Sequence, residues 1–247
     1  MKTLLSTTYC GPVQWYQKLY RSEEVLMERQ ETFQKQTYRN RCVIATTNGL
    51  QTLTVPVERS SSNLIKDIRI SNHGNWRHQH WFALMSAYNE SPFFDYYQDD
   101  FRPFYERQYD FLYDFNMEIC HKVCELIDIQ PNIKETSFYR SVGVRPLPPP
   151  SPCRGSLTSN PSSLISHLSS KIGSSPHSTN LSTRQLVNSS TEIIDFRSAI
   201  NPKHPADDAD FVPRRYYQVY ERKHGFQPNL SILDLLFNMG PESVFWL

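Results

Sequence analysis

Two arginines flank an asparagine in the segment Arg39-Asn40-Arg41, which lies at the start of a predicted strand. Because side chains alternate across a strand, Arg39 and Arg41 share one face and Asn40 takes the other. Two guanidinium groups on one face can hold a phosphate or a carboxylate through paired hydrogen bonds. The alternatives are a solvated face for the arginines and, for Asn40, a buried amide in a structural hydrogen-bond network.

Three histidines, His73, His78 and His80, precede an apolar helical stripe. Positions two apart on a helix are separated by about 200°, so His78 and His80 do not readily share one ion, and we predict no metal site. His80 lies at the edge of the stripe, where an imidazole can lean into a cleft and act as the catalytic base. The alternative is a partly buried histidine with one backbone hydrogen bond.

Two of the five cysteines, Cys120 and Cys124, are one helical turn apart and favour core packing, because no second Cys/His pair with zinc-ligand spacing lies near them. Cys42 could form an acyl-enzyme, but alternation places it on the Asn40 face, where a buried thiol is inert unless a base lowers its pKa. The odd number and wide spacing of the cysteines fit a reducing compartment. We therefore expect a cytoplasmic protein.

Near the end of the chain, Gln218, Asn229 and Asp234 lie among aromatic residues. Asp234 has an ordinary explanation as a capping-box residue, and Asn229 as a turn residue after Pro228. Aromatic rings beside amides and a carboxylate are also typical of sugar pockets. These three residues are therefore candidates for substrate binding.

Composition excludes several classes of function. The 247 residues carry 26 Lys and Arg against 25 Asp and Glu, which gives no reason to expect a nucleic-acid partner. The eight glycines are too widely spaced for a dinucleotide fingerprint, a P-loop or a hydrolase nucleophile elbow, and we predict no cofactor. No apolar run is long enough for a signal peptide or a membrane span.

The elements that must position these residues are strands first and helices later. Apolar β-favouring runs predict strands at Lys2–Thr8 and Glu23–Met27, a hairpin from Tyr38–Ala45 to Gln51–Val57, and a short strand around Ile68 and Ile70. Helical periodicity predicts a helix that carries Trp81, Leu84, Met85 and Tyr88, and another that carries Leu112, Phe115, Ile119, Val123 and Leu126. Ser91-Pro92 is typical of a helix start, as is Ser231, whose helix ends at Gly240-Pro241. This order predicts an α+β domain, a mixed N-terminal sheet packed against several helices.

Residues 141–191 differ from the rest of the chain. They contain 15 Ser and 7 Pro but no Asp, Glu, Phe, Trp or Tyr. Such a segment buries too little apolar surface to offset its chain entropy. It is either a disordered insertion in a single domain formed by 1–140 and 192–247, or a stretch translated out of frame between two compensating indels.

Several separated motifs resemble the WbqC-like proteins of bacterial surface-polysaccharide gene clusters. They are Gln36–Ile44, Leu53–Val57, Trp76 with His80-Trp81 and Tyr88, Ser91–Phe94, Tyr217–Tyr220, Gly225-Phe226 and Asn229–Glu242. The resemblance implies a role in O-antigen or related glycan synthesis, with transfer of an acyl or aminoacyl group to an amino sugar as a suggested activity.

On this hypothesis Arg39 and Arg41 hold a phosphate of a sugar nucleotide or of a carrier-bound thioester, and His80 removes a proton from the attacking amine. Gln218, Asn229 and Asp234 orient the sugar. A partner, such as a carrier protein, must supply the activated donor, because the chain has no nucleotide-activating motif. The rival hypothesis is a non-catalytic binding or assembly protein that recognises the same glycan intermediate.

Overall fold

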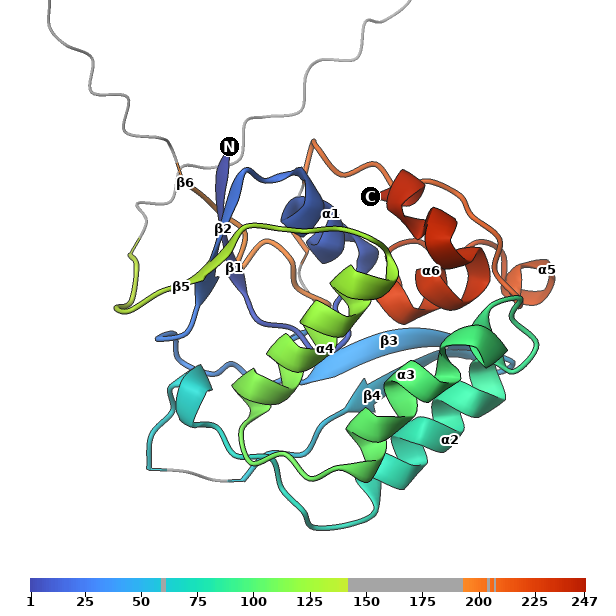
Figure 1. Cartoon of the computed structure of the whole chain (residues 1–247), viewed down its shortest axis with the longest axis horizontal. Helices are drawn as coiled ribbons and strands as arrows, with labels where there is room; N and C mark the ends of the chain where they lie inside the picture. The colour runs from blue at the N-terminus through green and yellow to red at the C-terminus, as the bar shows by residue number, and fades with distance from the viewer. Residues whose placement is uncertain (59–60, 142–192, 204, 207) are drawn as a thin grey trace, which may run out of the picture. The chain divides into compact units, whose positions relative to one another are not determined.

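The structure is a computed structural model, and it describes residues 1–58, 61–141, 193–203, 205–206 and 208–247 (Figure 1). These residues form one domain with an α+β fold, as the sequence predicts. In chain order the elements are β1 (Lys2–Ser6), α1 (Val13–Arg21), β2 (Glu24–Glu28), β3 (Arg41–Thr46), β4 (Gly49–Thr54), the 3₁₀ turn η1 (Ile65–Asp67), α2 (Trp76–Tyr88), α3 (Phe94–Glu106), α4 (Leu112–Leu126), β5 (Ile133–Glu135), β6 (Ile193–Asp195), α5 (Glu221–His224), α6 (Ile232–Met239) and the 3₁₀ helix η2 (Gly240–Trp246). Apart from Ser141, the predicted insertion 141–191 lies outside the described residues.

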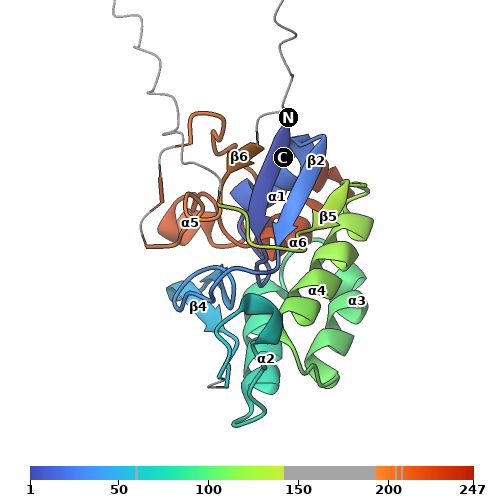
Figure 2. The same ribbon diagram turned by 90° about the vertical axis from the view of Figure 1, so that its left-hand side faces the viewer.

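A four-stranded sheet in the order β5-β2-β1-β6 forms one half of the domain, and all of its neighbouring strands are parallel (Figure 2). Its central strands β1 and β2 are almost wholly buried, and the polar residues Thr3, Ser6 and Glu28 are buried together with the apolar ones. The strands β1 and β2 are joined through helix α1. Because the strands run in the same direction, their carboxyl ends gather at one edge of the sheet.

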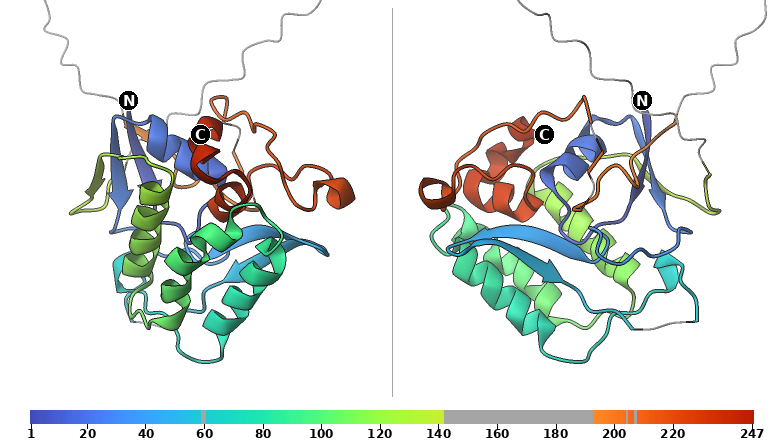
Figure 3. Two further views of the ribbon diagram at one scale, coloured as in Figure 1. Left: turned by 45° about the vertical axis from the view of Figure 1, so that its right-hand side comes forward. Right: turned by 180° about the vertical axis from the view of Figure 1, so that it is seen from behind.

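The predicted hairpin is confirmed, and it forms a separate two-stranded sheet from β3 and β4. Its register pairs Arg41 with Thr54 and Thr46 with Gly49, and Gly49 adopts a φ of +105° in the turn. Helices α2 and α6 pack against β3, and α2 and α3 lie side by side on one side of the hairpin (Figure 3).

Two local predictions differ from the structure. Ile68 and Ile70 do not belong to a strand: among the described residues the pairing of this segment is limited to two isolated bridges, Ile70 with Val57 and Arg69 with Phe111. Ser91 and Pro92 do not begin a helix either. They form a turn, and α3 starts at Phe94 without a side-chain cap.

The C-terminal helix begins and ends as predicted. The Ser231 hydroxyl accepts a hydrogen bond from the Leu233 amide at 3.3 Å and so caps α6. Gly240 ends the helix at a φ of +59°, and a Cβ atom there would lie 2.6 Å from the ring of Phe93. Among the described residues, no helix is long and apolar enough to cross a membrane.

Candidate functional site

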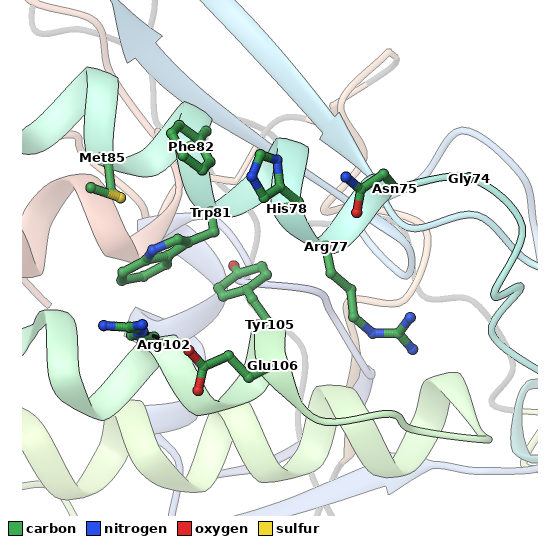
Figure 4. Close-up of a pocket in the computed structure, with 10 residues that line it drawn as sticks. All are labelled: Gly74, Asn75, Arg77, His78, Trp81, Phe82, Met85, Arg102, Tyr105 and Glu106. Atoms are coloured by element: carbon green, nitrogen blue, oxygen red, sulfur yellow. Dashed lines mark hydrogen bonds and ion pairs between the residues drawn. The ribbon is translucent and has the colours of Figure 1, made fainter.

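A cavity of about 500 Å³ opens between α2 and α3, and we call it the α2–α3 cavity (Figure 4). Its lining consists of Gly74, Asn75, Arg77, His78, Trp81, Phe82, Met85, Arg102, Tyr105 and Glu106. The walls therefore combine aromatic rings with a few polar and charged groups, a composition typical of small-molecule sites.

A chain of buried hydrogen bonds leads from Tyr105, on the wall of this cavity, to His80. The Tyr105 and Tyr9 hydroxyl oxygens are 3.0 Å apart, and the Tyr9 hydroxyl lies 2.9 Å from Nδ1 of His80. All three side chains are buried. His80 therefore does not line the cavity but is connected to it through two tyrosines.

Burial lowers the pKa of His80 to about 4, and a hydrogen bond with the backbone of Thr54 acts in the opposite direction. The imidazole is therefore neutral at physiological pH. In the tautomer that carries its proton on Nε2, Nδ1 is free to accept a hydrogen bond from the Tyr9 hydroxyl. Burial also raises the pKa values of Tyr9 and Tyr105 well above their usual range, so both hydroxyls stay protonated.

The two contacts of this chain can each be donated from either side, since the tautomer of His80 decides the first and either hydroxyl can donate in the second. A tyrosine has one hydroxyl hydrogen, so Tyr9 donates it either to Nδ1 of His80 or to Tyr105. In the state in which Tyr9 donates to His80, Tyr105 donates to Tyr9, and a proton taken up by the Tyr105 oxygen can pass inward to His80. The Tyr105 hydroxyl also contacts Cys10.

Arg39 lies away from the α2–α3 cavity, at the carboxyl edge of the parallel sheet. Its Nη2 atom donates to Oε2 of Glu31 at 2.6 Å and to the Ser6 hydroxyl at 2.7 Å, and its Nε donates to Oε1 of Glu31 at 2.8 Å. Only about 4% of Arg39 and 5% of Glu31 is exposed. The guanidinium of Arg39 is thus committed to a buried ion pair.

Sequence reasoning missed the other charged groups at this edge. Glu28 is fully buried at the end of β2 and accepts hydrogen bonds from Thr136, Arg197 and the Arg140 amide. Arg197 in turn pairs with Asp195 at the end of β6. A cavity of about 440 Å³ lies beside this network, and carboxyl edges of parallel sheets commonly bind ligands. The charged groups here satisfy one another, however, which is also how a structural network behaves.

Arg39 and Asn40 lie in a turn, because β3 begins only at Arg41, so the predicted strand face shared by Arg39 and Arg41 does not form. The Asn40 amide donates to the Val55 carbonyl at 3.0 Å and helps to hold the hairpin, while its Oδ1 is buried without a partner among the described residues. Arg41 is half-buried, and its Nε has no partner within the same part of the chain. Arg41 pairs across the hairpin with Thr54, whose backbone contacts His80.

Gln218 and Asp234 come together in a buried cluster beneath α6. The Asp234 carboxylate accepts hydrogen bonds from the hydroxyls of Tyr88 at 2.9 Å and Tyr216 at 2.7 Å, and from Nε2 of Gln218 at 3.0 Å. Asp234 is therefore not a capping-box residue, because its carboxylate turns toward the core instead of the helix start. The backbone N–H of Ser231 binds the Val43 carbonyl instead.

Asn229 is separate from this cluster and has a φ of +56°. Its Oδ1 accepts from the Gln14 backbone N–H at 2.9 Å, and its Nδ2 donates to Oε1 of Gln14 at 3.1 Å. Since Gln14 lies in the first turn of α1, Asn229 satisfies an amide that the helix itself leaves unpaired.

The comparisons with known proteins fit the motifs noted in the sequence. A family model described as the WbqC-like protein family matches residues 8–148, more than half of the chain. The chain belongs to the WbqC-like protein family. It is also similar to the uncharacterized protein Rv1507c of Mycobacterium tuberculosis (strain ATCC 25618 / H37Rv), with 25% identity over 228 residues, which cover 91% of this chain and 87% of that protein. No solved structure matches.

The family match covers one part of the candidate site and not the other. Tyr9, His80, Tyr105 and the Arg39-Asn40-Arg41 segment lie within residues 8–148, whereas Asp234 and its partners Tyr216 and Gln218 lie beyond them. Tyr9 and Tyr105 carried no signal in the sequence beyond their aromatic type. The long-range contact through which Tyr9 reaches His80 could not be foreseen from spacing alone.

We expect Asp234→Asn to remove a pH dependence of stability. Burial raises the pKa of Asp234 to about 6, while the hydrogen bonds from Tyr216, Tyr88 and Gln218 act in the opposite direction. A carboxyl whose folded pKa is raised contributes stability that is complete below about pH 4 and is lost as the pH rises to about 6. The loss is about 3 kcal/mol, since the pKa differs by about two units from its ordinary value.

Urea unfolding at pH 4.5 and pH 7.5 measures about 2 kcal/mol of this loss, because the carboxyl of the unfolded chain is already mostly ionised at pH 4.5. His80 acts in the opposite sense, because its lowered pKa favours the folded state as the pH rises, so the difference between wild type and Asp234→Asn isolates the carboxyl. If the free energy of unfolding changes equally with pH in wild type and in Asp234→Asn, the pKa of Asp234 is not raised in the folded protein.

Proposed function

We propose that the chain acts in the cytoplasm in surface-polysaccharide biosynthesis and transfers an acyl or aminoacyl group to the amino group of a nucleotide-linked sugar. Membership of the WbqC-like family supports the biosynthetic setting. The donor is an activated acyl group, such as a thioester on a carrier protein, and the acceptor amino sugar occupies the α2–α3 cavity.

The observation that carries the proposal is the hydrogen-bonded chain from Tyr105 through Tyr9 to the neutral, buried His80. An amine attacks an acyl carbon only as its proton is removed, and a proton acceptor connected to a cavity meets that requirement. The aromatic residues Trp81 and Phe82, on the same walls, are suited to the C–H faces of a sugar ring.

The reaction balances through this chain. The amine lone pair forms the C–N bond, and the C–S bond of the thioester breaks. The amine proton passes to the oxygen of Tyr105 as the Tyr105 proton moves to Tyr9 and the Tyr9 proton moves to Nδ1 of His80. Return of the proton along the same path to the leaving thiolate gives an amide and a free thiol and restores neutral His80.

The remaining predicted residues take roles that follow from their surroundings. Asn40, Gln218, Asn229 and Asp234 act as positioning residues, because each is held in hydrogen bonds within the protein. In particular, Tyr88 of α2 is tied to Asp234 of α6, which fixes the helix that carries His80. Arg39 instead holds the carboxyl edge of the parallel sheet through Glu31. Within the described residues the buried Nε of Arg41 has no partner, so Arg41 is the one of the two arginines that is available to an anionic group. It lies opposite Thr54 in the hairpin.

A turnover assay tests the proposal. Purified protein is mixed with a nucleotide-linked 4-amino or 3-amino sugar and an acyl or aminoacyl thioester, and the product is measured by mass spectrometry. We expect an amide product and a stoichiometric free thiol that are absent without protein. The same sugar with its amino group already acetylated is the control, and release of thiol from that mixture would indicate simple hydrolysis.

A non-catalytic protein that binds the glycan intermediate is the second candidate, and the complete burial of the hydroxyl chain favours it. The same assay separates the two. A binding protein gives saturable association with the amino sugar and no amide across donors of different acyl length.

A further inference from the structure

Arg77 lies at one end of the α2–α3 cavity, and its guanidinium lacks a polar partner in the part of the chain that the structure describes. Its Nε and Nη2 atoms are both buried and form no hydrogen bond there. The guanidinium carbon lies 4.7 Å from the centre of the Trp76 ring, so the group is held over an aromatic face. A cation is therefore presented at the cavity without a counter-charge.

Arg102, the second arginine that lines this cavity, has a polar partner. Nε of Arg102 donates to Oε1 of Glu106 at 2.6 Å, and both side chains are more than half exposed. Figure 4 shows this pair at the opposite end of the cavity from the guanidinium of Arg77. The charge of Arg102 is thus compensated by Glu106, while that of Arg77 is left for a ligand.

The surroundings of Arg77 favour an anion further. Gly74 and Asn75 line the cavity just before the start of α2, and no side chain caps this 13-residue helix, so the positive end of its dipole lies at the same end of the cavity. Burial also disfavours an isolated charge, and an anionic ligand would remove that cost. Guanidinium forks match phosphate oxygens in geometry.

From these observations we infer that the Arg77 end of the cavity binds the diphosphate of a nucleotide-linked sugar. The anion site is inferred from the position and contacts of Arg77, whereas the choice of a sugar nucleotide as its ligand rests on the proposed function. The rings of Trp81 and Phe82 then lie along the part of the cavity that the base or the sugar occupies.

Isothermal titration calorimetry with UDP as the probe tests this inference on the full chain. Arg77→Lys keeps the charge and loses the fork, and Arg77→Met removes the charge but keeps an apolar stem over Trp76. We expect UDP affinity to fall about 10- to 100-fold in Arg77→Met and by less in Arg77→Lys, the range for loss of charge-assisted hydrogen bonds. The matched control is Arg102→Met, which should change affinity by less than about fivefold.

Inorganic pyrophosphate and 4′-phosphopantetheine distinguish the possible sources of the phosphate. Competition by pyrophosphate and UDP, with weak or no competition by 4′-phosphopantetheine, supports a sugar nucleotide. Preferential binding of 4′-phosphopantetheine, no affinity for UDP at millimolar concentration, or equal losses in the Arg77 and Arg102 variants would overturn the inference. The thermal midpoint of each variant, measured together with the titrations, identifies any variant that does not fold. If Arg77→Met does not fold, Arg77→Lys decides the test.

This test is independent of turnover. UDP binding that depends on Arg77 supports the site even if no amide is formed, and amide formation without UDP affinity would contradict the site while leaving acyl transfer intact.

Discussion

Glu31→Gln is expected to lower the free energy of unfolding by about 3–5 kcal/mol, the cost of removing one partner of a buried ion pair. Glu31 engages Arg39 through both carboxylate oxygens, and both residues are almost fully buried. The substitution leaves the Arg39 guanidinium desolvated without a counter-charge. Urea unfolding at pH 7 measures the change.

Glu135→Gln is the matched control, because Glu135 pairs with Arg29 at the same edge of the sheet but is 44% exposed. Its cost should stay below about 1 kcal/mol. The double variant Glu31→Leu with Arg39→Met should recover much of the lost stability, since apolar residues of similar size often replace a buried pair. A cost below 1 kcal/mol for Glu31→Gln would show that solvent reaches the pair.

His80→Gln and Tyr105→Phe are each expected to lower kcat by about 10²- to 10⁴-fold, the usual contribution of a proton acceptor. His80→Gln removes the terminal acceptor, and Tyr105→Phe breaks the path to it at the cavity wall. Tyr105→Phe should cost only about 1 kcal/mol of stability, because one hydrogen bond is lost. Steady-state kinetics of amide formation measure both variants.

The pH profile separates this role from a structural one. Since the pKa of His80 is lowered to about 4, activity that depends on its neutral form should be level from pH 6 to 8 and fall only as the pH approaches 4. His78→Gln is the control, because His78 is exposed on the same cavity but outside the hydroxyl chain. Retention of turnover within threefold in His80→Gln would remove His80 from the mechanism.

The sequence predicted the strands and helices that show a local pattern, such as periodic apolar residues or a turn motif. The apolar runs of β1 and β2, the turn between β3 and β4, and the stripes of α2, α4 and α6 depend on local spacing, and all of them are present. The parallel order was not predictable in the same way. Strands β5 and β6 have three residues each, and β6 pairs with β1 across nearly the whole chain.

The candidate site shows the same division between local and distant contacts. Asp234 follows Ser231 at the spacing of a capping box, yet contacts with Tyr88 and Tyr216 direct its carboxylate into the core. Arg39 and Arg41 are two residues apart, but β3 begins only at Arg41, and Glu31 binds Arg39 in the turn before the strand. In both cases the residue that determines the side-chain orientation lies in another segment of the chain, and the periodicity of the sequence does not predict such a contact.

A structure of the protein with a bound nucleotide-linked amino sugar shows directly where the acceptor binds. We expect the sugar in the α2–α3 cavity, with its amino nitrogen within about 3.2 Å of the Tyr105 oxygen and its diphosphate on Arg77. A sugar bound at the carboxyl edge of the parallel sheet, beside Arg39 and Arg197, or bound with its amino group away from Tyr105, would contradict this expectation.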